Sequence, residues 1–225
     1  MASTSISSSE EEAWKNVKEV VGKCGDQASI NQGYTKWNDY EKDMAALSYQ
    51  APTEAVNRVM SWVPDKGSRI LDFGCGTGLV ADLLHDNGYT SVHGVDPVEK
   101  LIETCTKKGT YTSTTVLEID PVTKIPFEND YFEAVVSSGV FGKGGAGGDI
   151  SPYTEIVRVL RPGGFFVNFI RESNWEYRRK DELNQREVYD KLCADGVLSM
   201  RSRDKCDYYK TSTPLPGMVL VVEKN

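Results

Sequence analysis

The sequence lacks the features that mark membrane, secreted and metal-binding proteins. No window approaches the roughly 18 consecutive apolar residues of a membrane span. The opening, MASTSISSSEEEAWKNVKEV, has no apolar segment behind a basic one, as a secretory signal would have. The cysteines are odd in number and never spaced as C-x-x-C, which argues against disulfides or a zinc site and for a reducing compartment. We therefore expect a cytoplasmic protein without a metal site, the nucleus being the alternative compartment.

Excess positive charge is also missing. The 225 residues include 26 Lys and Arg against 33 Asp and Glu, for a formal net charge of −7. Such a chain has no global field that attracts a polyanion, so nucleic acid is disfavoured as a partner. Only two histidines are present, His85 and His93. We expect a small-molecule or protein partner, no membrane contact and a monomeric chain.

What the sequence does contain is an alternation of strand and helix signals, which predicts a doubly wound α/β sheet with helices on both faces. The final two strands are close in sequence and predict an antiparallel edge hairpin. Residues 1–12 are expected to be a disordered tail, and 13–225 one domain with a helical cap over 13–52. Strands are expected at 68–73, 91–96, 112–120, 131–139, 163–172, within 197–210 and at 217–224, and helices at 55–63, 79–88, 97–109, 151–160 and 178–196.

A glycine-rich loop follows the first of these strands, in the stretch LDFGCGTG over 71–78. The first strand-to-helix turn of a doubly wound sheet is a preferred ligand site. The glycines form G-x-G-x-G at Gly74, Gly76 and Gly78, whereas a dinucleotide loop would place glycine at position 79, which is Leu79. No G-K-[ST] follows, so the loop is not a P-loop either. A nicotinamide oxidoreductase is disfavoured for the same reason.

Acidic residues end the next two strands. Asp96, in GVDP, can accept hydrogen bonds from both hydroxyls of a ribose. Asp120, in LEID, can accept from an adenine amine while Ile119 packs against the base. Each motif alone is an ordinary turn or helix cap. Their order and spacing, together with VLRPGG at 159–164, indicate a ligand that contains adenosine.

The series LDFGCGTG, GVDP, EID…IPFENDYFEAVVSSGVF and VLRPGGFFV resembles the class I S-adenosylmethionine-dependent methyltransferases, over roughly residues 54 to 170. Upstream, YTKWNDYEKDMAALSYQAP resembles the methyltransferase-like proteins encoded in the Williams–Beuren syndrome region, as does CGTGLVA…HGVD. The resemblance implies a Rossmann-like, mostly parallel seven-stranded sheet. It also implies S-adenosyl-L-methionine as cofactor and S-adenosyl-L-homocysteine as product.

The resemblance also implies roles for individual residues. The backbone of Gly74, Gly76 and Gly78 would pass under the methionyl and ribose groups, in a loop that includes Cys75, as a small apolar filler, and Leu79. Asp72 would hold the methionine ammonium directly or through water, and Asp96 the ribose, with Pro97 beside the adenine. Ile119 and Asp120 would frame the adenine, with Glu118 as the alternative to Asp120. Ser137 and Ser138 would face the reactive end of the cofactor. Tyr34, Trp37 and Tyr40 would cover the sulfonium, although Trp37 and Tyr40 fit a packing role equally well.

Methyl transfer from a sulfonium needs alignment and desolvation more than a catalytic triad, so the absence of a triad is compatible with activity. Ser138 and Tyr153 are the candidates for a catalytic role, and structural roles are expected for both histidines. The segment after the fourth strand, SSGVFGKGGAGG, carries neither a D/N-P-P-aromatic tetrad nor a Pro-Cys pair, which disfavours base methylation. Its glycines at 142–148 form either a lid or a plain surface connection; beside a lid, Asp149, Tyr153 and Arg171 would select the acceptor.

Two functions follow from these observations. The first is an S-adenosylmethionine-dependent methyltransferase that acts on a small molecule or a protein. The alternative is a non-catalytic module that binds S-adenosylmethionine or S-adenosylhomocysteine and serves regulation or interaction, because no motif identifies an acceptor.

Overall fold

The computed structural model describes residues 6–21, 27–118, 123–142, 151–178 and 183–225. Several sequence-based expectations concern positions outside these ranges. They are the proposed adenine contacts Ile119 and Asp120, the polar residue Asp149, and all of the glycine-rich loop except Gly142.

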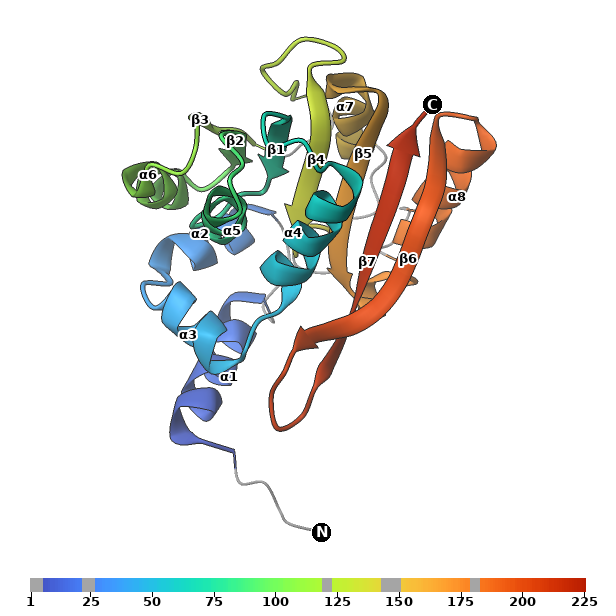
Figure 1. The fold of residues 1–225 in the computed structure, drawn as a ribbon. Coiled ribbons are helices and arrows are strands. Elements are labelled where there is room, and N and C mark those ends of the chain that lie inside the picture. Colours follow the sequence, from blue (N-terminus) through green and yellow to red (C-terminus); the bar gives the residue numbers. More distant parts are fainter. Residues whose placement is uncertain (1–5, 22–26, 119–122, 143–150, 179–182) are drawn as a thin grey trace.

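Seven strands form one sheet in the order β3-β2-β1-β4-β5-β7-β6 (Figure 1). The first five strands pair in parallel, and β7 pairs antiparallel with both β5 and β6. The predicted seven-stranded sheet and its antiparallel edge hairpin are thereby confirmed. The strands are β1 (Arg69–Phe73), β2 (Ser91–Asp96), β3 (Ser113–Val116), β4 (Phe132–Ser138), β5 (Leu160–Arg171), β6 (Leu198–Tyr209) and β7 (Leu215–Lys224).

Helices cover both faces of this sheet. Helices α4 and α5 bury their apolar sides in one core cluster, against Ile70 and Val136 among others. Helices α7 and α8 pack into a second cluster on the other face, with Leu71 and Val135. Alternate residues of β1 and β4 therefore point to opposite faces, as the pleat of a strand requires. The helices are α1 (Ser8–Val21), α2 (Gln27–Lys36), α3 (Tyr40–Ala46), α4 (Ala51–Trp62), α5 (Leu79–Asp86), α6 (Glu99–Lys108), α7 (Ser151–Val159) and α8 (Gln185–Ala194), with a 3₁₀ turn at Glu172–Asn174.

Several predicted boundaries differ from the structure, among them the end of the third strand and the start of the last helix. The third strand ends at Val116 rather than at residue 120. The helix expected from residue 178 begins at Gln185, because Asn184 forms a capping box: its Oδ1 accepts from the Glu187 N–H, and the Glu187 carboxylate accepts from the Asn184 N–H, both at 2.9 Å. The polar residues before Asn184 suggested a longer helix, whereas this cap fixes its start.

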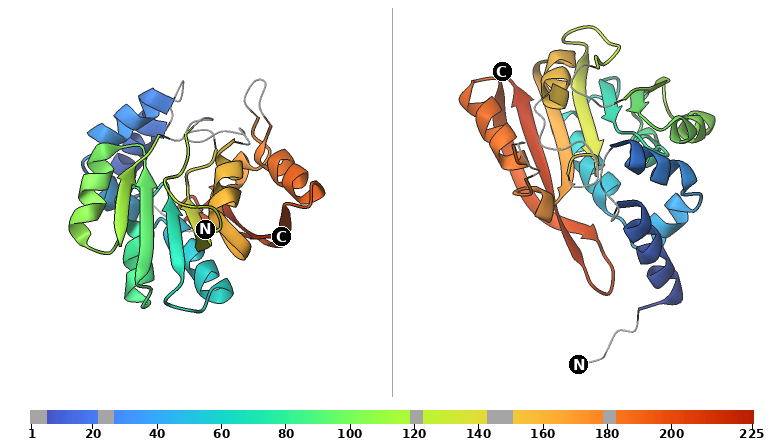
Figure 2. Two further views of the ribbon diagram at one scale, coloured as in Figure 1. Left: turned by 90° about the horizontal axis from the view of Figure 1, so that it is seen from above. Right: turned by 180° about the vertical axis from the view of Figure 1, so that it is seen from behind.

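Helices α1, α2 and α3 form a cap at the end of the sheet toward which β4 points, far from α8 (Figures 1 and 2). Trp14 of α1 lies edge-on to Tyr209 of β6, with ring centroids 5.2 Å apart. The Ser212 hydroxyl donates to the Glu10 carboxylate at 2.9 Å. The cap is thus held to the β6–β7 hairpin by an aromatic contact and a hydrogen bond. Because α1 begins at Ser8, residues 8–12 belong to this cap and not to the predicted tail.

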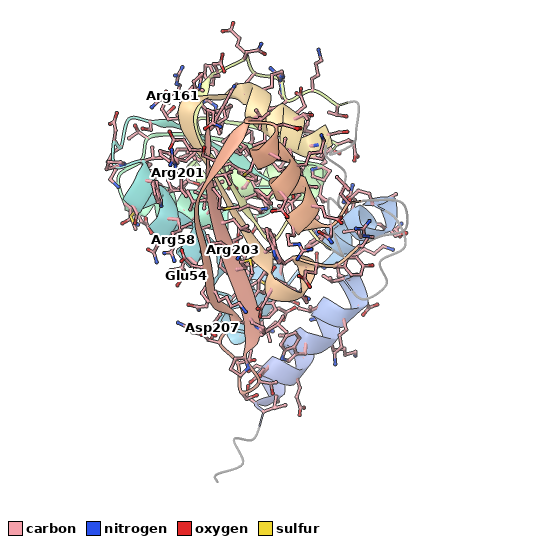
Figure 3. The ribbon with its side chains drawn as sticks, turned by 90° about the vertical axis from the view of Figure 1, so that its right-hand side faces the viewer. Glu54, Arg58, Arg161, Arg201, Arg203 and Asp207 are labelled. Carbon is pink, nitrogen blue, oxygen red and sulfur yellow. The ribbon has the colours of Figure 1, made fainter. Side chains whose placement is uncertain are left out.

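Strand β6 is the edge of the sheet and carries many charged side chains (Figure 3). Arg201 pairs with Glu223 of β7 at 2.7 Å, and Arg58 of α4 reaches Asp204 at 3.4 Å. The pairing of β6 with β7 is interrupted by irregularities between Met200 and Ser202 and between Asp207 and Tyr209. Charge and irregular pairing both discourage the addition of another strand at this edge.

None of the helices in the described ranges has the length and apolar character needed to cross a membrane.

Candidate functional site

A cavity of about 430 Å³ lies between the carboxyl ends of the parallel strands and the cap. Its floor comes from the loop after β1 and from the ends of β2, β4 and β5, and its cover comes from α1, α2 and α3. Ligands of doubly wound sheets bind at this end of the strands. Of the predicted site residues in the described ranges, Tyr34, Gly74, Gly76, Asp96, Pro97 and Ser138 line this cavity, as do Trp37, Tyr40 and Arg171.

The glycine loop turns sharply beneath this cavity. Gly74, Gly76 and Gly78 all have positive φ, of 78°, 54° and 95°, a region that other residues enter at a cost. A Cβ on Gly74 would lie 2.2 Å from Cγ2 of Val140, so this position has no room for a side chain. A Cβ on Gly76 would meet no protein atom within 4 Å. The backbone at Gly76 is therefore open on its cavity side.

Asp96 holds this loop in place from the end of β2. Its Oδ2 accepts from the Gly76 N–H at 3.0 Å, and its Oδ1 accepts from the Val98 N–H at 2.9 Å. The carboxylate is buried, yet it lines the cavity. Burial raises its pKa to about 6, against the two backbone hydrogen bonds, which lower it. Each carboxylate oxygen retains a lone pair for a further donor.

Asp72 lies beneath the loop and outside the cavity lining. Its Oδ2 accepts from the Tyr111 hydroxyl at 2.6 Å, while its Oδ1 is buried and has no hydrogen-bond partner in the described part of the chain. Burial raises the pKa of Asp72 to about 7. An unpaired buried carboxylate oxygen is costly, which suits a site completed by a donor from a ligand or water.

Tyr111 packs beneath the glycine loop, outside the cavity lining, and the sequence did not indicate it. Besides its bond to Asp72, its ring packs where a Cβ on Gly94 would sit, at 2.8 Å, and 3.3 Å from where one on Gly78 would sit. It lies just before β3, where the sequence shows only a tyrosine between two threonines. Neither a motif nor a spacing distinguishes it from an ordinary turn residue.

The other expected loop contacts lie behind the cavity wall. Cys75 is buried and clusters with Ile102 and Cys105 of α6, which agrees with a small apolar filler. Gly78 precedes α5 as its N-cap, and Leu79 is the first residue of that helix. Neither Cys75, Gly78 nor Leu79 lines the cavity.

Aromatic residues of the cap cover the cavity from above. Tyr34 stacks on Trp37 with centroids 5.9 Å apart, and Trp37 meets Tyr40 edge-on at 5.1 Å. The Trp37 indole N–H donates to Asp43 at 2.6 Å in the protein interior. Tyr34, Trp37 and Tyr40 thus serve both as cavity lining and as packing of the cap.

At the end of β4, Ser138 lies beside two tyrosines. The hydroxyl of Tyr49 is 3.5 Å from Ser138 Oγ and 3.3 Å from the hydroxyl of Tyr208. Burial and the neighbouring Tyr208 raise the pKa of Tyr49 well above its usual value, so its hydroxyl stays protonated at neutral pH. These three hydroxyls can donate and accept hydrogen bonds, but none is a ready base.

Two expected residues lie away from the cavity. Ser137 is fully buried in β4, and its Oγ has no partner in the described part of the protein. Tyr153, on α7, belongs to the core of the opposite sheet face and donates a hydrogen bond to Gln185. Of Ser137, Ser138 and Tyr153, the structure therefore places only Ser138 in the cavity lining.

The two histidines are not in the cavity lining. His93 is buried in β2, with its Nδ1 at 2.7 Å from the Ser113 hydroxyl, and burial lowers its pKa. His85 lies on α5. Within the described ranges, no cluster of three His, Cys, Asp or Glu side chains is arranged to hold a metal ion.

The strand order and the glycine loop at the carboxyl end of β1 define a Rossmann-like methyltransferase fold. Among solved structures, one chain of the complex between the Haloferax volcanii Trm112 methyltransferase activator and a methyltransferase superposes with a TM-score of 0.65 at 17% identity, over 87% of this chain and 97% of that one. A SAM-dependent methyltransferase of Methanosarcina mazei gives a TM-score of 0.55 at 17% identity, over 74% and 96%.

Sequence comparisons extend this from the fold to the family. The family described as "Methyltransferase domain" matches residues 71–168. Human methyltransferase-like protein 27 is 32% identical over 173 residues, which is 72% of this chain and 68% of that protein. The ubiquinone biosynthesis O-methyltransferase of Bradyrhizobium diazoefficiens is 30% identical over 146 residues, or 61% and 51%. The chain belongs to the methyltransferase family that includes methyltransferase-like protein 27, as its motifs indicated.

Proposed function

We propose that this protein is an S-adenosylmethionine-dependent methyltransferase that transfers a methyl group to a small-molecule or protein acceptor by in-line displacement. The observation that carries the proposal is the arrangement of Asp96 and Gly76. The buried carboxylate of Asp96 lines the cavity and can accept further hydrogen bonds. It lies next to the backbone of Gly76, which has open space on its cavity side.

The residues present fit this cofactor. Asp96 would accept from the two ribose hydroxyls, and Pro97 would lie against the adenine. The unpaired Oδ1 of Asp72 offers an acceptor for the methionine ammonium, directly or through water. Tyr34 would face the sulfonium with its ring. By the same reasoning Ile119 and Asp120, which lie outside the described residues, would frame the adenine.

When bound, the cofactor supplies a methyl group on a sulfonium. Its transfer requires that the acceptor atom lie in line with the carbon–sulfur bond, and it does not require covalent catalysis by the protein. The contribution of this chain is to orient and to exclude water. The cap aromatics shield the cavity from solvent. Ser138, Tyr49 and Tyr208 surround the place where β4 ends, and they would position the acceptor atom by hydrogen bonds.

The alternative of a non-catalytic binding module has one observation in its favour. Asp96 is the only carboxylate among the described residues that line the cavity, and it already accepts two backbone hydrogen bonds. The hydroxyl of Tyr49 stays protonated, because burial raises its pKa. A catalytic function therefore requires an acceptor that is nucleophilic without a strong base, or one that enters already ionised.

Calorimetric titration with S-adenosylmethionine and S-adenosylhomocysteine tests the first step, and S-adenosylhomocysteine formation in the presence of cell extract tests the second. Binding of both ligands with turnover in extract supports the methyltransferase. Binding without turnover in any extract supports the binding module. Tight binding of NAD without binding of S-adenosylmethionine contradicts both.

We further propose that the protein acts as a monomer in the cytoplasm and that nucleic acid is not its acceptor. The charged, irregular edge at β6 supports the monomer, and the net charge of −7 argues against a nucleic-acid acceptor. Because one similar fold was solved with the Trm112 activator, a protein partner is the alternative to an isolated chain. Light scattering of the purified protein, alone and after co-expression with candidate partners, tests this point.

A further inference from the structure

The cavity carries little charge, and the charge is unevenly placed. Three residues of its described lining have charged side chains: Lys18, Asp96 and Arg171. Asp96 lies at the end of β2 and Arg171 at the end of β5. Three strand spacings separate these strands in the sheet order, or roughly 14 Å. The strand that carries Arg171 is therefore not adjacent to the strand whose carboxylate would hold the ribose.

Arg171 is unusual among the arginines of this chain because no described carboxylate lies within ion-pair distance of it. Its guanidinium lies over the rings of Tyr208 and Tyr209, at 5.0 and 5.6 Å, and donates to the Tyr209 hydroxyl at 3.4 Å. The other described arginines all have carboxylate partners, except Arg203, which is exposed on β6 over the Trp175 ring. A half-buried cation without a counter-charge is a site prepared for an anion.

The position of Arg171 matches the acceptor side of the cavity. Ser138, at the end of β4, is paired with Phe169 of β5, two residues before Arg171. A molecule held by Arg171 would therefore lie beside Ser138 and Gly139, beyond the glycine loop of β1. The contacts of Arg171 come from β6, on the side away from β1 and β2. Both facts indicate that Arg171 lies outside the part of the cavity that is proposed to hold the cofactor.

Aromatic rings form the walls around this guanidinium. Tyr49 lies 5.1 Å from Tyr208 and 5.4 Å from Tyr209, measured between ring centroids, and Trp14 lies against Tyr209. All four side chains line the cavity. Such walls suit a flat, apolar body whose polar atoms are at its ends.

We infer that the methyl acceptor is a small organic carboxylate with an aromatic or similarly flat body, whose carboxylate pairs with Arg171 between Tyr208 and Tyr209. This inference rests on the proposed function, because it assigns the acceptor of the same site. It also fits the absence of a strong base: one oxygen of the ionised carboxylate attacks the methyl carbon as the carbon–sulfur bond of the sulfonium breaks, which gives a methyl ester and S-adenosylhomocysteine with no proton to remove.

The test uses the full chain loaded with S-adenosylhomocysteine and a panel of paired probes. Benzoate, 4-hydroxybenzoate and cinnamate are titrated by calorimetry beside benzamide, 4-hydroxybenzamide and cinnamamide, which match them in shape and lack the charge. The inference expects at least one carboxylate to bind about tenfold or more tightly than its amide. Binding by no carboxylate of the panel, or equal binding of acid and amide, overturns it.

Two variants locate the effect. Arg171→Met removes the charge but keeps an unbranched apolar side chain, and should weaken carboxylate binding by about ten- to a hundredfold. Arg171→Lys should restore part of the loss. Arg203→Met is the matched control. Arg203, on β6 and labelled in Figure 3, also lies over an aromatic ring, but it is not in the cavity lining. Unchanged carboxylate affinity in Arg171→Met overturns the inference.

A second measurement separates the acceptor from the cofactor. The same variants are titrated with S-adenosylhomocysteine and with 5′-methylthioadenosine, which lacks the amino-acid group. The inference expects Arg171→Met to bind both as the wild type does, which also shows that the variant is folded. A loss confined to S-adenosylhomocysteine would assign Arg171 to the methionyl carboxylate and overturn the inference. If the wild type bound neither nucleoside, the proposed function itself would fail.

Discussion

Asp96 has two tasks at the residue scale, since it fixes the glycine loop through Gly76 and offers its remaining lone pairs to the cavity. We expect Asp96→Ala to weaken S-adenosylhomocysteine binding by about 1.5–3 kcal/mol, the range for hydrogen bonds to a charged group. Calorimetry at pH 7.5 measures this loss. Asp86→Ala, at an exposed position on α5, is the control and should bind normally.

The same carboxylate predicts how binding depends on pH. Because the pKa of Asp96 is raised to about 6, its charged form is lost as the pH falls through that value. Wild-type affinity for S-adenosylhomocysteine should therefore decline below pH 6, whereas the affinity of Asp96→Ala should change little there. Parallel decline in both proteins would assign the pH dependence to another group.

Asp72 predicts a pH dependence of stability in the unliganded protein. Burial raises its pKa from 3.8 to about 7, so the native state keeps a proton that the unfolded chain releases between those values. The contribution of Asp72 to the stability of the wild type is therefore greatest below pH 4 and falls as the pH rises toward 7. In Asp72→Asn this loss is absent.

The measurement is urea unfolding of both proteins at several pH values between 4 and 8. The free energy of unfolding of Asp72→Asn, relative to the wild type, should rise by a few kcal/mol over this interval. A difference that stays constant with pH would show that Asp72 does not titrate in this range. Asp86→Asn serves as the exposed control.

At residue scale, the sequence indicated the cavity residues whose backbone or carboxylate defines the motif, such as Gly74, Gly76 and Asp96. It missed Tyr111, because a hydrogen bond across the sheet leaves no periodic or spacing signal. It also grouped Ser137 with Ser138, although neighbouring residues of a strand point to opposite faces, and Ser138 alone lines the cavity.

At the scale of elements, the glycine loop offers a matched pair of substitutions. Gly76 and Gly109 both have positive φ, and a Cβ on either would meet no protein atom within 4 Å. Alanine at each position should cost about 1–2 kcal/mol of stability through backbone strain. Only Gly76→Ala places its methyl group in the cavity, so it alone should reduce S-adenosylhomocysteine affinity, by more than about tenfold.

Thermal unfolding and calorimetry on both variants check this prediction. Similar losses of stability with a selective loss of affinity in Gly76→Ala would support the loop as the floor of the cofactor site. Normal affinity in Gly76→Ala would show that the ligand does not approach the loop closely.

Element positions were predictable where apolar periodicity and glycine boundaries agreed, as in β2, whose predicted and observed ends are the same. Prediction was poorer where a boundary depends on a side-chain contact. The start of α8 is set by the hydrogen bonds between Asn184 and Glu187, which apolar periodicity does not register. The cap helices were expected as a group, but their placement depends on contacts with β6 that are distant in sequence.

At the scale of the whole molecule, a ligand in the cavity would contact the sheet and the cap together. Ile30, Asn31 and Tyr34 of α2 line the cavity opposite Asp96. Lys100 of α6 joins the two layers by donating to the Thr35 carbonyl at 2.7 Å. Binding should therefore stabilise α2 as well as the glycine loop.

Hydrogen–deuterium exchange with and without S-adenosylhomocysteine measures this coupling. Amides of α2 should exchange more slowly in the complex, together with those of the loop over 74–78. Protection limited to the loop would show that the cap does not take part in binding. Exchange in α8, which lies on the far side of the molecule, provides the internal reference (Figure 1).

The contact between α1 and the β6–β7 hairpin also has a consequence for biosynthesis. The hydrogen bond from Ser212 to Glu10 joins residues 202 positions apart. At 5–20 residues per second, a ribosome makes the second partner roughly 10–40 s after the first. During that interval Trp14 of α1 lacks its aromatic partner, Tyr209 of β6. The cover of the cavity is thus translated before the hairpin that holds it, and until that hairpin forms, the exposed aromatic side of α1 is a target for chaperones.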